Sequence, residues 1–360
     1  MTFYCILWEL KTPCPSDASL RGVLAVTEKK RGEKLQRNMS IPAHLLIGKK
    51  AVGNTNEEVM TNADMNWTAA KGPVISPETG KNLPPKFQRV YREDNDHTLG
   101  MVGKNYHILQ PAEMFSIADS LVGDGLAEWS RVGQVGHGEK MYALLDLPEH
   151  ITIGDNDQHD AKLYLSNTMD GSGSVRVYPT LERLFCRNQT SAFNRNLQKM
   201  GFSPSDLTIR HSSKMHEKIG DLKNALNLSN QMIDIWANQA EEMLDVTMEF
   251  KDRETFYIEA FNMKPQKELV HKVDNPLGLP TQSRRRLEAL AELETSQTNT
   301  VGGMADTPFQ AFNVLTEYID HQTPVRADGT VKVTTAENTI FGAGGRTKSN
   351  AWARLVDAHL

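Results

Sequence analysis

Residues 162–186 read KLYLSNTMDGSGSVRVYPTLERLFC, and this stretch decides the fold. Runs typical of β-strands stand on both sides of a Gly/Ser-rich turn at Asp170–Gly171, which is the pattern of a β-hairpin. Because successive side chains of a strand point to opposite faces, Arg176 and Tyr178 are expected to share one face, and Val175 and Val177 the other. The stretch therefore predicts an antiparallel sheet.

Elements before this hairpin extend the same pattern. Strand-like runs flank the turns at residues 95–98 and 136–138. Thr55, with Glu58 three residues later, is a candidate N-cap of a short helix. Pro111 suits the first position of a second helix. The first half of the chain thus predicts hairpins with packed helices.

After Lys214 the pattern changes to apolar residues at three- and four-residue spacing, which predicts a long amphipathic helix. Further helices are expected at residues 254–263, 284–294, 308–321 and 348–359. The predicted class is therefore α+β: an antiparallel sheet of hairpins with packed helices, followed by a mainly helical C-terminal part. We divide the chain into an N-terminal extension (1–38), with Met39 as a candidate natural start, an α+β sheet domain (39–212) and a helical region packed on it (213–360).

The composition is that of a globular protein, with 360 residues, 39% of them hydrophobic and 24% charged. The sequence has neither an apolar run of membrane-spanning length nor a signal-peptide pattern, so no membrane association is expected. The three cysteines form no CxxC pair, which indicates neither a zinc ribbon nor a disulfide framework. A reducing cytoplasm fits these features best.

The charge is unevenly distributed along the chain. The formal net charge is −5, yet residues 161–220 hold nine basic and four acidic side chains. Guanidinium groups hold phosphates and aromatic rings stack on bases, so this segment predicts a surface for single-stranded nucleic acid. The alternative is that its arginines tie the sheet to the acidic helical part. The predicted binding residues are Arg176, Tyr178, Arg183, Arg187, Arg195, Lys199, Arg346 and Lys348.

Two short motifs approach known sites without matching them. Residues 154–160 (GDNDQHD) gather oxygen ligands, but Asp160 and Ser166 stand where a calcium loop needs Gly and Glu, so a solvated turn is favoured. Residues 342–349 (GAGGRTKS) approach a phosphate-binding loop, but Thr347 replaces its second Gly. A weaker hypothesis keeps Arg346 and Lys348 as phosphate contacts at the start of the last helix. We predict no cofactor, no metal and no catalytic residue.

Several segments in order resemble one family. They include ADMNWTAAKGPV (63–74), YREDNDHTLGMVGKNYHILQPAEMF (91–115), the hairpin stretch above and FQAFNVLTEYIDH (309–321). Together these segments are similar to the phage- and plasmid-like proteins grouped as domain of unknown function 932, over residues 39–360. Phe309 stands where members usually carry Trp. The motif positions are Asn66, Trp67, Leu99, Val102, Tyr106, Gln110, Asp170, Gly171, Ser172, Arg183, Cys186, Asn188, Asn313, Glu317 and Tyr318.

The resemblance implies an origin in phages, prophages or plasmids and supplies no catalytic residues. By analogy of architecture with phage single-strand annealing proteins, we expect a homo-oligomer that binds single-stranded DNA, with strand annealing in replication or recombination as its role. Two alternatives stay open. One is a magnesium-dependent enzyme acting on nucleic acid or nucleotide, and the other is a regulatory or host-interaction protein.

Overall fold

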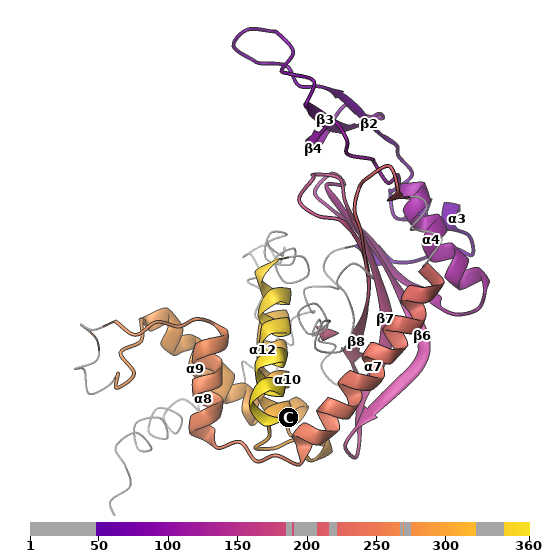
Figure 1. Cartoon of the computed structure of the whole chain (residues 1–360). Coiled ribbons are helices and arrows are strands. Elements are labelled where there is room, and N and C mark those ends of the chain that lie inside the picture. Colours follow the sequence, from indigo (N-terminus) through magenta and orange to yellow (C-terminus); the bar gives the residue numbers. More distant parts are fainter. Residues whose placement is uncertain are drawn as a thin grey trace, which may run out of the picture.

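The structure is a computed structural model that describes residues 48–184, 189–190, 207–215, 222–266, 269, 275–321 and 342–360. Antiparallel sheets form the N-terminal half, and helices dominate the C-terminal part (Figure 1). The predicted α+β class is confirmed. The candidate start at Met39 and the extension before it lie outside the described residues, and the division at residue 212 stays a prediction.

The larger sheet has seven strands in the order β1–β5–β6–β7–β8–β10, with β9 also paired to β8. The hairpin predicted around Asp170–Gly171 supplies its neighbouring strands β7 and β8, with Ser166 opposite Arg176 in their register. The turns expected at residues 136–138 and 170–171 do join neighbouring antiparallel strands. The strands are β1 (Lys49–Lys50), β5 (Glu128–Val135), β6 (Lys140–Ile153), β7 (Asp157–Thr168), β8 (Val175–Arg183), β9 (Gln189–Thr190) and β10 (Thr208–Ile209).

The two faces of the larger sheet differ in chemistry. One face is apolar, and helix α7 (Leu222–Leu244) packs on it, where the ring centroid of Trp236 lies 5.3 Å from that of His159. The opposite face carries charged and tyrosine side chains that are also buried. The alternation of residues therefore predicted two distinct faces, but it did not predict that both would be buried. The apolar face includes Leu163, Leu165, Val175, Val177 and Leu181, and the polar face includes Lys162, Tyr164, Tyr178 and Glu182.

The smaller sheet projects from the larger one, and we call residues 69–105 the arm (Figure 1). Its strands, in the order β2–β3–β4, are β2 (Ala69–Pro73), β3 (Phe87–Arg92) and β4 (Thr98–Gly103). The hairpin predicted around residues 95–98 joins β3 to β4. Val90, Leu99 and Val102 are buried in the hydrophobic core, so one side of the arm faces inward.

Two short helices begin where the sequence predicted. Helix α3 (Asn56–Asn62) is capped by Thr55, whose side chain accepts a hydrogen bond from the Glu58 amide. Helix α4 (Pro111–Gly123) starts at its proline, and Gln110 and Glu113 form a capping box. These caps satisfy backbone amides that a helix start leaves without intrahelical acceptors.

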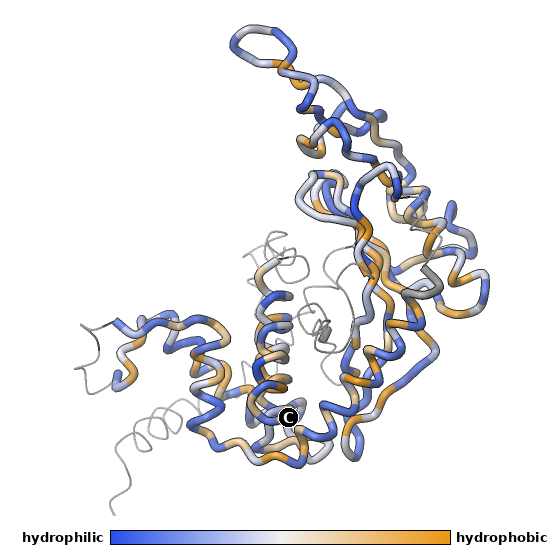
Figure 2. Tube along the Cα trace, in the orientation of Figure 1, coloured by the Kyte–Doolittle hydropathy of each residue, from blue (hydrophilic) through white to orange (hydrophobic). Residues whose placement is uncertain are grey.

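The C-terminal part is built around helix α10 (Pro308–His321), whose bounds match the prediction. Phe309, Phe312 and Leu315 are fully buried, so neighbouring elements surround this helix. In Figure 2, hydrophilic and hydrophobic residues alternate along α7 and α12, and no helix in the described part of the chain is long and apolar enough to cross a membrane. The other elements are α8 (Phe250–Ala260), α9 (Thr281–Glu294), η2 (Gln297–Asn299), η3 (Val301–Gly303) and α12 (Ala343–His359).

Candidate functional site: exposed cations and a buried polar network

The structure separates the eight predicted binding residues into three groups. Arg176 and Arg346 are exposed. Three others are buried, namely Tyr178, Arg183 and Lys348. The predicted strip is therefore not a continuous exposed surface over its described part. Arg187, Arg195 and Lys199 lie outside the described residues.

Tyr178 shares its sheet face with Arg176, as predicted, but its ring does not meet solvent. The residue is only 8% exposed, and its ring centroid lies 4.9 Å from that of Tyr164 on β7. Burial raises the pKa of the Tyr178 hydroxyl well above its usual value. The expectation of a solvent-facing stacking ring at Tyr178 is therefore wrong. Strand alternation predicts which face of the sheet a side chain lies on, but not whether that face is exposed to solvent.

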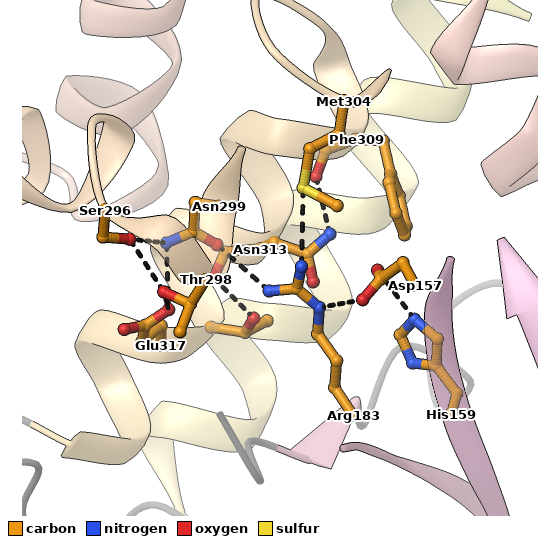
Figure 3. A network of polar contacts seen from close by, with 11 residues as sticks. Asp157, His159, Arg183, Ser296, Thr298, Asn299, Met304, Phe309, Asn313 and Glu317 are labelled. Carbon is orange, nitrogen blue, oxygen red and sulfur yellow. Dashed lines mark hydrogen bonds and ion pairs between the residues drawn. The ribbon is translucent and has the colours of Figure 1, made fainter. Parts of the chain in front are cut away.

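Arg183 connects the sheet to the helical part instead of binding a ligand at the surface. Its Nε donates to Asp157 over 2.7 Å, and one terminal nitrogen donates to Asn299 over 3.2 Å (Figure 3). The other terminal nitrogen lies 3.5 Å from the Met304 sulfur. Because Arg183 is fully buried, its predicted contact with nucleic acid is wrong, and the alternative that arginines tie the two parts together holds for this residue.

The network continues on both sides of Arg183 (Figure 3). Asn299 donates to Glu317 of α10 over 2.9 Å, and Thr298 donates to the same oxygen over 2.8 Å. On the sheet side, a His159 ring nitrogen lies 3.0 Å from the second carboxylate oxygen of Asp157. Burial lowers the pKa of His159, so its imidazole is neutral at neutral pH. The network thus joins β7 and β8 to η2 and α10.

Asp157 and His159 belong to this network, although the sequence pattern did not predict that role. Both belong to β7, which begins at Asp157, and both are fully buried. The solvated turn expected over residues 154–160 is therefore wrong beyond Asn156. The period-two spacing of Asp157 and His159, leading into Ala161 and Leu163, was the available signal. In the described part of the chain, no group of three potential metal ligands lies close together.

Lys348 also forms an ion pair inside the protein. Helix α12 begins at Ala343, so residues 343–349 are helical and form no phosphate-binding loop. The Lys348 ammonium donates to the Asp320 carboxylate of α10, and both side chains are almost completely buried. The predicted phosphate contact of Lys348 is therefore wrong, whereas Arg346, one half-turn earlier, is exposed.

The exposed positive charge near β8 comes from three residues whose proximity the sequence pattern did not predict. Thr208 of β10 lies opposite Arg176, which places Arg210 close to the same edge of the sheet. Lys214 follows four residues later, and all three cationic side chains are exposed. We call Arg176, Arg210 and Lys214 the cationic edge. Arg210 and Lys214 contributed to the segment's charge but were not predicted as site residues, because only the pairing of β10 with β8 reveals their proximity to Arg176.

The antiparallel sheets and the helical part define the class of protein, an α+β fold. A family model described as domain of unknown function (DUF932) matches residues 98–339, more than half of the chain. The chain therefore belongs to this family, as the resemblance predicted. A search of curated proteins and a search of solved structures gave no match.

Proposed function

We propose that this protein binds single-stranded nucleic acid, with the cationic edge holding the phosphate backbone. The observation that carries the proposal is the pairing of Thr208 with Arg176, which brings two exposed arginines together at one sheet edge. Guanidinium groups bind phosphates with little regard to base sequence. A role in replication or recombination of a mobile element, in the cytoplasm of a bacterial host, belongs to the same proposal.

The enzymatic alternative has less support. It relied on acidic residues in the 154–160 segment and on Lys348. Asp157 faces the Arg183 guanidinium, and Lys348 faces Asp320, both in buried ion pairs. The charges of Asp157 and Lys348 are therefore already balanced by protein partners, whereas Asp155 of the same segment is exposed. The exposed cations have the better support, because the pairing of β10 with β8 places Arg210 near Arg176.

The test measures binding to a fluorescently labelled 30-nucleotide single strand at several salt concentrations, with fluorescence anisotropy as the readout. The logarithm of the affinity falls linearly with the logarithm of the salt concentration, and each lost phosphate contact makes this slope shallower by roughly 0.7 for a single strand. We expect Arg176→Ala combined with Arg210→Ala to weaken binding and to lower the slope by about 1.4. Arg285→Ala, an exposed arginine of α9, is the matched control and should leave the slope unchanged.

Two outcomes would contradict the proposal. One is the absence of any salt-sensitive binding by the unaltered protein. The other is a double variant at Arg176 and Arg210 whose salt slope equals that of the unaltered protein, because the phosphate contacts would then lie elsewhere.

A further inference from the structure

The outer face of the arm is a partly exposed surface that combines aromatic, apolar and cationic side chains. Phe87, Arg89 and Tyr91 occupy alternate positions of β3, and Met101 of β4 lies opposite Arg89. Phe87 is 44% exposed and Met101 is 61% exposed. Val90 is fully buried on the inner side, so the strand separates an inward apolar face from this outward one.

Gly72 of β2 leaves room for the Tyr91 ring and the Arg89 guanidinium. A Cβ atom at Gly72 would stand 3.1 Å from the Tyr91 ring and 3.4 Å from the Arg89 Nε, so a side chain here would crowd both groups. The Arg89 guanidinium carbon lies 4.3 Å from the Tyr91 ring centroid. Arg89 also forms an ion pair of 2.6 Å with Asp96. The Arg89–Tyr91 stack is therefore held in a fixed orientation.

The arm is positively charged although the whole chain is negative. Residues 69–105 contain six basic and four acidic side chains, against a net charge of −5 for the protein. The Lys86 ammonium lies 5.0 Å from the Phe87 ring centroid, so a ligand reaching this ring meets a cation as well. Exposed rings beside cations suit a polyanion that carries flat bases better than they suit a purely apolar partner.

The residues that follow the arm contact His211, the residue next to Arg210 of the cationic edge. The ring of Tyr106, just after the arm, stacks on His211 with centroids 4.4 Å apart. The His107 amide donates to the His211 carbonyl over 3.2 Å, and His211 follows Arg210 in the chain. A nucleic-acid strand whose phosphates lie along the cationic edge therefore passes close to the base of the arm.

We propose that the outer face of the arm is a base-contacting surface for single-stranded nucleic acid, and this rests on the proposed function. Phe87 and Met101 contact the bases, since an aromatic ring stacks on any base and a thioether packs against flat rings. Lys86 and Arg89 contact the adjoining phosphates. The cationic edge and the arm thus divide the work: the edge holds the backbone and the arm holds the bases.

The experiment compares two probes of equal charge, a 30-nucleotide oligodeoxythymidine and an abasic strand of the same length. The unaltered full-length protein should bind the oligodeoxythymidine more tightly, by about 5- to 150-fold for one stacked base. Phe87→Ala combined with Met101→Ala should remove this preference and leave the salt slope unchanged. Phe87→Tyr keeps a ring and should retain the preference, and Ile75→Ala, an exposed apolar residue of the arm outside its strands, should also retain it.

Asp96→Asn provides a measurement of opposite sign. Asp96 has a φ of 59°, a conformation that asparagine also adopts readily, so the turn should persist. Releasing Arg89 from its acidic partner should tighten binding to both probes and steepen the salt slope by roughly 0.7.

The results separate this inference from the function on which it rests. If the unaltered protein binds neither probe, the proposed function itself is wrong. If it binds but Phe87→Ala with Met101→Ala leaves the preference for bases intact, the cationic edge stands and the arm proposal is overturned. The arm proposal is equally overturned if this double variant changes only the mass of the protein measured by light scattering, because the face would then contact a second copy of the chain.

Discussion

The Nε of Arg183 lies 2.7 Å from a carboxylate oxygen of Asp157, and neither side chain is exposed to solvent by more than 1%. The two residues are 26 positions apart, on neighbouring strands, and the arginine continues to Asn299 in the helical part. A buried charge is costly unless a partner of opposite sign accompanies it. Each residue of this pair therefore balances the buried charge of the other, at the place where Arg183 also contacts the helical part.

Replacing Arg183 by Met should destabilise the protein strongly, because Asp157 would remain as a buried charge without its guanidinium partner. Losses of this kind are about 3–5 kcal/mol. The free energy of unfolding is measured by urea denaturation followed by circular dichroism. Arg176→Ala changes an exposed arginine of the same strand and should alter stability by no more than about 0.5 kcal/mol. Equal effects of the two substitutions would show that the ion pair does not hold the network together.

Protonation of His159 should make the protein less stable in mild acid. Burial lowers the pKa of His159 in the folded protein below its ordinary value of 6.5. As the pH falls below about 6.5, the unfolded chain takes up a proton before the folded one, so stability present at higher pH is lost. His159→Gln removes this titration, so the free energy of unfolding of the variant should change less with pH than that of the unaltered protein. One titrating group accounts for at most about 1.4 kcal/mol per pH unit. Denaturation at pH 7.5 and pH 5.5 tests this, and identical losses for both proteins would contradict it.

Local patterns predicted much of the fold, since strand alternation, turn residues and helix caps act over a few positions. Helix α10 and the hairpin of β7 and β8 are of this kind. The candidate site was harder to predict, because Arg183 and Arg176 look alike in a strand pattern although one is buried and the other exposed. What distinguishes them is contact with Asn299, which comes more than 100 residues later in the chain.

Lys348 and Arg346 offer the same contrast within one helix. Lys348→Met would leave the Asp320 carboxylate in a buried position without its ammonium partner, so the thermal midpoint should fall clearly, in line with a loss of about 3–5 kcal/mol. Arg346→Ala removes an exposed cation of the same turn and should have little effect on the midpoint. If Lys348→Met kept the original midpoint and instead weakened binding to a single strand, Lys348 would be a ligand contact after all.

The arm should be sensitive to a single methyl group at Gly100. A Cβ atom there would stand 2.4 Å from the Cα atom of Asp170, in the turn between β7 and β8, and backbone atoms cannot move aside as a flexible side chain can. We expect Gly100→Ala to push the arm away from the larger sheet, to lower the thermal midpoint and to increase amide hydrogen exchange in β3 and β4. Gly103→Ala is the matched control, because a Cβ atom at this position of the same strand would meet no atom within 4 Å. If hydrogen exchange in the arm were the same in the two variants, the contact between Gly100 and Asp170 would not fix the position of the arm.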